Sequence, residues 1–165
     1  MKVRAFLADS VQAVDGKLYA LGAGWNRLAA GGFPARHDRV GIGVIVTLDG
    51  ADAGEHNLEL SLLDAHRRPV AMFVGPDGTE QFALHATFQT PVPKEGFVGM
   101  AVPMALNLDG LSFPEPGTYA FSIGVDGAEM EDLPFQVDLA ASGGEETDEG
   151  PGTTTAPGVG DAGYL

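Results

Sequence analysis

One stretch, Val40–Leu48 (VGIGVIVTL), decides the fold class of this chain, because every second residue in it is a branched or aliphatic one. Side chains of a β-strand point to opposite faces in turn, so this alternation predicts a strand with one buried face. The same period of two recurs in five further stretches, at residues 58–62, 82–88, 98–106, 119–125 and 133–139. No window has the apolar spacing that a helix requires. The chain is therefore expected to be all-β.

Turn signals separate these stretches. Asp126-Gly127 lies between two alternating runs and predicts a two-residue hairpin, since both residue types accept a positive φ. A similar Asp15-Gly16 turn predicts neighbouring strands, with Val3–Ala8 before it and Lys17–Leu21 after it, and residues 69–74 predict one more. The total is about eight or nine strands.

Prolines and a tyrosine refine the architecture. Pro103 and Pro134 lie inside strand patterns and predict edge strands or bulges, because proline has no N–H for the ladder. The corner Pro114–Gly117 leads into a strand that contains Tyr119, which resembles the tyrosine corner of Greek-key sandwiches. We expect an immunoglobulin-like antiparallel β-sandwich, with the strand before Asp49 at the centre of a sheet.

Composition changes after Leu139. The sequence predicts a β-sandwich domain over residues 1–139 and a disordered acidic tail over residues 140–165, rich in Gly, Thr and Pro. A segment with almost nothing apolar to bury cannot offset the entropy cost of its own ordering. The exception is the end, Gly163-Tyr164-Leu165, where an aromatic and an aliphatic residue follow a tract that otherwise avoids them.

Charge and composition exclude several function classes. The formal net charge is −14, and the tail contributes five acidic residues with no Lys or Arg. Such a chain repels nucleic-acid phosphates and anionic membrane surfaces. It has no cysteine, so disulfides and thiolate metal sites are excluded. No segment approaches the length of a membrane span and none fits a signal peptide, so the expected location is the cytoplasm.

Sequence motifs for catalysis are missing. The serine-hydrolase elbow and the phosphate-binding loop do not occur, and Gly22-Ala23-Gly24 lacks the third glycine of the dinucleotide fingerprint. The histidines do not pair at metal-binding spacings, and His85 is expected on the solvent side of its strand. We expect no enzyme activity, no cofactor and no metal.

Two binding regions are predicted. Trp25, the only tryptophan, is either a core aromatic or, together with Arg27, part of a partner-binding face. The other region is the chain end, Gly163, Tyr164 and Leu165.

Two resemblances accompany these patterns. Residues 1–25, together with the stretch from Pro114 to Val137, resemble an uncharacterised bacterial family of small β-sandwich proteins that is common in actinobacteria. The resemblance spans residues 1–139 and implies the fold but no function. The end Gly163-Tyr164-Leu165 is similar to the tails of bacterial proteasome activators, which finish Gly-Gln-Tyr-Leu, although a glycine stands here where that family has Gln. The resemblance implies that the tail enters a pocket of the proteasome α-ring, where its carboxylate pairs with a lysine.

The expected function is therefore a non-enzymatic binding or adaptor module with a protein partner, whose tail docks into a larger assembly such as the bacterial proteasome core. The alternatives are a self-assembling or structural protein, in which the strands of Pro103 and Pro134 pair between copies, and a small-ligand carrier with a cavity between its sheets.

Overall fold

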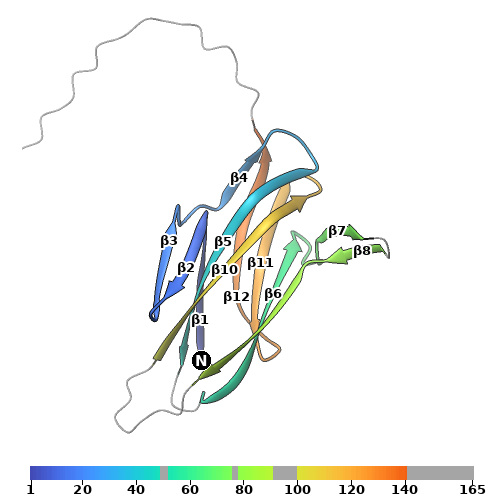
Figure 1. Cartoon of the computed structure of the whole chain (residues 1–165). Helices are drawn as coiled ribbons and strands as arrows, with labels where there is room; N and C mark the ends of the chain where they lie inside the picture. The colour runs from blue at the N-terminus through green and yellow to red at the C-terminus, as the bar shows by residue number, and fades with distance from the viewer. Residues whose placement is uncertain (49–51, 76–77, 91–99, 141–165) are drawn as a thin grey trace, which may run out of the picture.

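A computed structural model describes residues 1–48, 52–75, 78–90 and 100–140 of the chain, and this described part contains twelve strands and no helix (Figure 1). The all-β expectation is thereby confirmed. None of the described residues belongs to a helix that is long and apolar enough to cross a membrane. Residues 141–165, which make up the predicted tail except for Ala140, lie outside the described residues.

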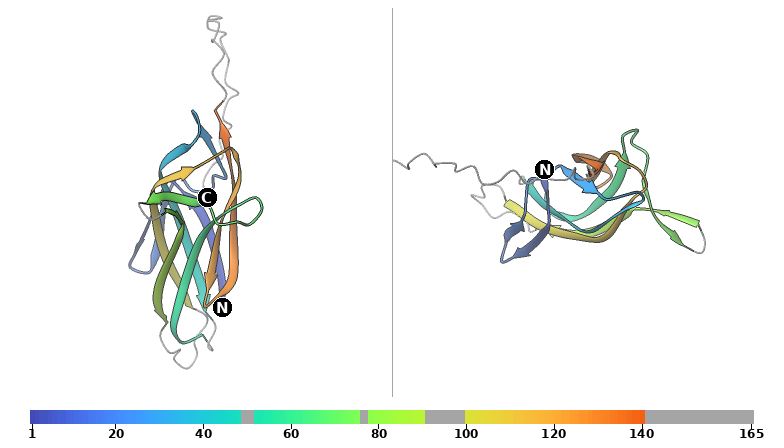
Figure 2. Two further views of the ribbon diagram at one scale, coloured as in Figure 1. Left: turned by 90° about the vertical axis from the view of Figure 1, so that its right-hand side faces the viewer. Right: turned by 90° about the horizontal axis from the view of Figure 1, so that it is seen from above.

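Two main sheets and two hairpins make up the fold (Figure 1). The three-stranded sheet has the order β1 (Lys2–Ala8), β5 (Ala35–Leu48), β10 (Met100–Phe113). The five-stranded sheet has the order β4 (Arg27–Ala30), β12 (Ala128–Leu139), β11 (Gly117–Val125), β6 (Gly54–Asp64), β9 (Ala83–Thr90). The hairpins are β2 (Ser10–Val14) with β3 (Lys17–Leu21), and β7 (Ala71–Gly75) with β8 (Gly78–Gln81). They project on different sides of the molecule (Figure 2).

The core lies between the two main sheets and is built from their alternating residues. Ile42, Val44 and Val46 of β5 are completely buried, as the sequence predicts. They belong to the same apolar cluster as the buried face of β6 and β11. Aromatic rings complete this cluster, with Phe121 stacked on Phe135 at a centroid distance of 5.3 Å. The strand before Asp49 is at the centre of the three-stranded sheet, as expected.

The predicted turns are confirmed. Asp126 and Gly127 have φ angles of 53° and 76°, and Asp15 and Gly16 have 50° and 70°, so both pairs form two-residue hairpin turns. The Tyr119 hydroxyl donates a hydrogen bond of 2.7 Å to the backbone carbonyl of Glu115, four residues upstream. This contact ties the corner before β11 to the strand itself.

The proline predictions are partly confirmed. Pro103 is on β10, which is an edge strand of its sheet. Pro134 is on β12, which lies between β4 and β11 and is not an edge strand. However, β4 pairs only with Gln136–Leu139 of β12. On the side of β12 opposite β11, Pro134 therefore lies outside the pairing with β4. The missing N–H therefore costs no hydrogen bond there.

The structure departs from the sequence prediction in two respects. It has twelve described strands rather than eight or nine, because short strands such as β2 and β4 are too brief to show a period of two. The strand pairs are antiparallel, as expected, except that β4 pairs with β12 in parallel. The pairing joins four residues of β4 to four residues of β12.

Candidate functional site

The β2–β3 hairpin carries most of the exposed large apolar side chains in the described part of the chain. Val14, Tyr19 and Leu21 are 40%, 54% and 71% exposed, and Leu139 at the end of β12 is the fourth such residue. The hairpin register places Val14, Tyr19 and Leu21 on the same side. We call these three residues the hairpin face. A folded chain gains nothing from exposing such side chains together, so this face is a candidate partner-binding surface.

The opposite side of the hairpin packs on the outer side of the three-stranded sheet. Gly41 and Gly43 alternate with the inward residues of β5 and therefore face outward. A Cβ atom at Gly41 would lie 3.0 Å from the backbone of Ser10, and one at Gly43 would lie 2.9 Å from Leu18 Cδ2. The missing side chains let the hairpin approach the sheet closely, and Val11 is buried in the contact.

Asn107 of β10 fixes the hairpin in place through its side-chain amide. Its Oδ1 accepts a hydrogen bond of 3.0 Å from the backbone N–H of Val11, and its Nδ2 donates one of 2.9 Å to the carbonyl oxygen of Val11. The amide thus satisfies both backbone groups of one residue, as a neighbouring strand would. The hairpin face is therefore presented by a held element rather than by a free loop.

The predicted residues Trp25 and Arg27 occupy different environments. Trp25 is half-buried and packs edge-to-face against Phe135 and His37, each at a centroid distance of 6.2 Å. Its Nε1 is buried, and none of the residues that the structure describes forms a hydrogen bond with it. Arg27 on β4 is exposed, and its Nε and Nη2 both donate to Asp138. Trp25 thus packs with the core, whereas Arg27 faces solvent.

The other predicted residues, Gly163, Tyr164 and Leu165, lie outside the described residues. The described chain reaches Ala140, whose N–H donates a hydrogen bond of 2.7 Å to the carbonyl of Ala30. The last described residue therefore lies beside the end of β4.

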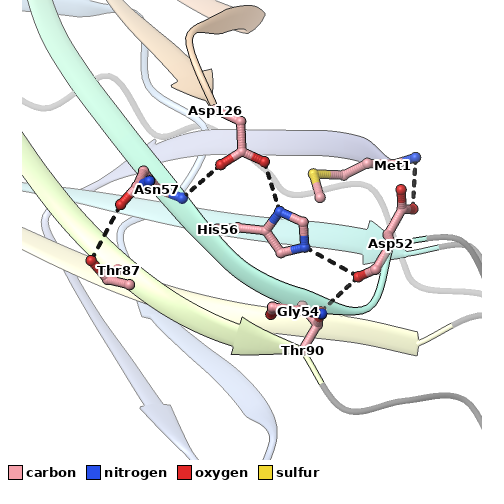
Figure 3. A network of polar contacts seen from close by, with 8 residues as sticks. All are labelled: Met1, Asp52, Gly54, His56, Asn57, Thr87, Thr90 and Asp126. Atoms are coloured by element: carbon pink, nitrogen blue, oxygen red, sulfur yellow. Dashed lines mark hydrogen bonds and ion pairs between the residues drawn. The ribbon is translucent and has the colours of Figure 1, made fainter.

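A polar network surrounds His56 at the opposite end of β12, where the hairpin turn of β11 and β12 lies (Figure 3). His56 Nδ1 is 2.7 Å from Asp126 Oδ2, and Nε2 is 3.1 Å from the backbone oxygen of Asp52. Asp126 also accepts a hydrogen bond from the N–H of Asn57, and Thr90 donates one to the same oxygen of Asp52. The network joins the start of β6, the end of β9 and the turn between β11 and β12.

The Asp126 carboxylate and the Asp52 backbone carbonyl can only accept hydrogen bonds. Both ring nitrogens of His56 must therefore donate, which requires the charged imidazolium. The Asp126 carboxylate raises the pKa of His56 by hydrogen bonding, and His56 in turn lowers the pKa of Asp126. The His56 ring also packs on the ring of Phe88, with a centroid distance of 5.4 Å. With both nitrogens engaged, the ring holds strands together and offers no free nitrogen for acid–base chemistry. Among the described residues, no three His, Asp or Glu side chains are placed to hold a metal ion.

Sequence reasoning missed the residues that build the hairpin face. The Asp15-Gly16 turn pointed to the hairpin, but nothing in the sequence showed which side of it would be covered. Asn107 lies 96 residues from Val11 and is one polar residue in an alternating strand, so its role had no local signal.

No curated protein matches the sequence. One family model matches residues 3–138, which cover the whole of the described β-structure except its ends. The chain therefore belongs to this family, the family of unknown function DUF6941.

Proposed function

We propose that the protein is a non-enzymatic binding module that docks a protein partner on the hairpin face. The observation that carries this proposal is the grouping of Val14, Tyr19 and Leu21 on a hairpin that Asn107 holds against the sheet. Tyrosine is enriched at protein interfaces, and exposed apolar side chains grouped on one face mark an interaction site. Because the chain carries a net charge of −14, a protein surface fits this face better than a nucleic acid.

The tail supplies a second contact in this proposal. Tyr164 and Leu165 end a long tract of small and acidic residues, which suits a tether with one apolar anchor. The bacterial proteasome core is the proposed assembly, on the basis of the tail similarity. In this scheme the module acts as an adaptor in the cytoplasm of a proteasome-bearing bacterium, and the hairpin face holds the client.

We also propose that the domain is an immunoglobulin-like sandwich. The support is the Tyr119 hydroxyl bond to the carbonyl of Glu115, which has the geometry of a tyrosine corner. The two sheets that share one core have the layering of such a domain.

The experiment compares four versions of the protein as bait in a lysate of a proteasome-bearing bacterium. They are the intact chain, the double variant Tyr19→Ser/Leu21→Ser, the control Leu139→Ser, and a chain without Tyr164 and Leu165. Leu139 is 60% exposed but lies on β12, so its substitution removes exposed apolar area outside the hairpin face. The proposal expects one complex that the control retains and the double variant loses. Loss of the proteasome core from the shortened chain alone would support the tail contact.

If the shortened chain loses the proteasome core, binding of each version to the purified core separates a direct tail contact from an indirect one. Identical captures by all four versions would refute both contacts. Each variant is first compared with the intact chain by circular dichroism, so that a folding defect is not taken for a lost contact.

The alternative function is self-assembly, and the edge strands favour it. β10 and β9 each end their sheet, and an edge strand presents backbone groups that a second copy can pair with. Sedimentation at increasing protein concentration tests this alternative. A mass that rises toward a multiple of 17.1 kDa would support it, and a constant monomer mass would contradict it.

A further inference from the structure

The two main sheets, as the structure describes them, have four edge strands, and three of these carry features that discourage pairing with another chain. An open edge presents backbone N–H and C=O groups, and charged side chains, prolines or a short strand block it. β1 carries Lys2 and Arg4, β10 contains Pro103, and β4 is only four residues long and contains Arg27. The fourth edge strand, β9, runs for eight residues without a carboxylate, Lys, Arg, Pro or Gly.

Backbone geometry identifies the groups of β9 that face its open side. The Asn57 carbonyl on β6 accepts a hydrogen bond of 2.9 Å from the N–H of Asp126, so the backbone groups of Asn57 point toward β11. Thr87 on β9 lies opposite Asn57. At such a position of an antiparallel pair the two residues point their backbone groups away from each other, so the N–H and C=O of Thr87 face the open edge. The same alternation applies to His85 and Gln89.

Both faces of β9 suit a neighbouring strand. Leu84, Ala86 and Phe88 pack against the core, yet each is only half-buried at this open flank. A strand added there would remove more of their apolar surface from water. On the outer face His85 and Thr87 are exposed, and neither brings a carboxylate to the edge. The edge therefore offers free backbone groups, an apolar row and no acidic side chain of its own.

We propose that β9 pairs antiparallel with β9 of a second copy of this chain, so that two five-stranded sheets join into one. This inference rests on the alternative function of self-assembly and names its strand, its register and its partner. A two-fold axis at Ala86 aligns residues 83–89 of both copies in full. Leu84 then lies opposite Phe88 of the second copy, and His85 lies opposite Thr87. Because both copies use the same surface, the contact closes at a dimer.

This register makes the edge complementary to itself. His85 and Thr87 both direct their backbone groups outward, so each pair of them places a donor opposite an acceptor in both directions. Ala86 is the small residue at the axis, where the side chains of facing residues come closest. The acidic residues beside β9, Glu55 and Glu59, are on β6. Three strand spacings, about 14 Å, separate β6 of one copy from β6 of the other, which exceeds the screening length of about 8 Å at physiological salt.

Sedimentation at increasing protein concentration measures the dimer of the full chain at physiological salt. The mass is expected to rise from 17.1 kDa toward twice that value, with a Kd of about 100 μM or tighter. Hydrogen exchange at low and high protein concentration then locates the contact. The amides of His85, Thr87 and Gln89 should become protected at high concentration, whereas those of Ala86 and Phe88, which face β6, should not change.

Charged variants of β9 test the register. His85→Glu/Thr87→Glu places like charges opposite each other in the dimer and should weaken it about tenfold, as should His85→Lys/Thr87→Lys. An equimolar mixture of these two variants pairs opposite charges, so its affinity should return to within about threefold of the parent chain. The control Gln12→Glu/Ala101→Glu adds two carboxylates at exposed positions of β2 and β10 and should stay within about twofold of the parent. Circular dichroism shows whether each variant is folded.

A constant mass of 17.1 kDa at every concentration would overturn both this pairing and the alternative of self-assembly. Three results would overturn the β9 pairing alone and leave self-assembly through another surface. They are a dimer that the control weakens as much as the β9 variants do, a dimer that the mixture does not restore, and a dimer in which the amides of His85 and Thr87 stay unprotected. The capture experiment with the hairpin variants is independent of all these results.

Discussion

Replacing Asn107 with alanine should release the β2–β3 hairpin from the sheet. The substitution removes two hydrogen bonds, of 3.0 and 2.9 Å, to the backbone of Val11. Val11 is only 4% exposed, so water does not readily replace the lost partners. A net contribution of about 0.5–1.5 kcal/mol per hydrogen bond gives an expected loss of about 1–3 kcal/mol in the free energy of unfolding.

The substitution Asn107→Asp sharpens this prediction. The aspartate keeps an acceptor for the Val11 N–H, but its second oxygen faces the Val11 carbonyl oxygen in place of a donor. The variant should be less stable than the parent chain near neutral pH. It should recover part of the difference below about pH 4, where the protonated carboxyl group can donate again.

Urea unfolding followed by fluorescence measures the global effect, and hydrogen exchange of the Val11 amide measures local opening of the hairpin. Gln89→Ala is the control, because it removes a hydrogen bond between exposed side chains and should change stability by less than about 0.5 kcal/mol. The reasoning is refuted if Asn107→Ala behaves like this control and leaves the exchange rate of the Val11 amide unchanged.

Three more substitutions test other contacts by the same unfolding assay. The pKa of His56 is raised, so its contribution to stability is complete below about pH 6.5 and is lost as the pH rises through the folded-state value. His56→Gln should abolish that decline, and an unchanged pH profile would contradict the network. Tyr119→Phe should cost about 1–2 kcal/mol through the lost bond to Glu115, whereas Tyr19→Phe at an exposed position should be neutral. Gly43→Ala should cost about 1–3 kcal/mol, because its Cβ would lie 2.4 Å from Phe6 Cζ, and the control Gly117→Ala meets no atom within 4 Å. Equal stability of the two alanine variants would show that the side chains of Phe6 and Leu18 move aside freely.

Much of the fold was predictable because its signals are local. A strand with one buried face requires a period of two, so the buried residues of β5, β6 and β11 could be assigned from sequence. The turns Asp15-Gly16 and Asp126-Gly127 were predictable for a related reason, since few residue types accept a positive φ at consecutive positions. The Tyr119 corner was also predictable, because donor and acceptor are four residues apart.

The candidate sites were not predictable in this way, because each depends on residues that are distant in sequence. The hairpin face is exposed only because the other side of the hairpin covers Gly41 and Gly43. Asn107 is one more polar residue in a strand until the fold places it against Val11.

The sequence by itself determined where most of the long strands lie, which of their faces are buried and where two of the tight turns form, since neighbouring residues set these properties through backbone geometry. The tertiary structure alone decided the parallel pairing of β4 with β12, the exposure of Tyr19 and Leu21, and the position of Asn107 against Val11. Those properties depend on how separate segments pack across the core, and a hydrogen bond or an ion pair requires proximity in space whatever the separation along the chain.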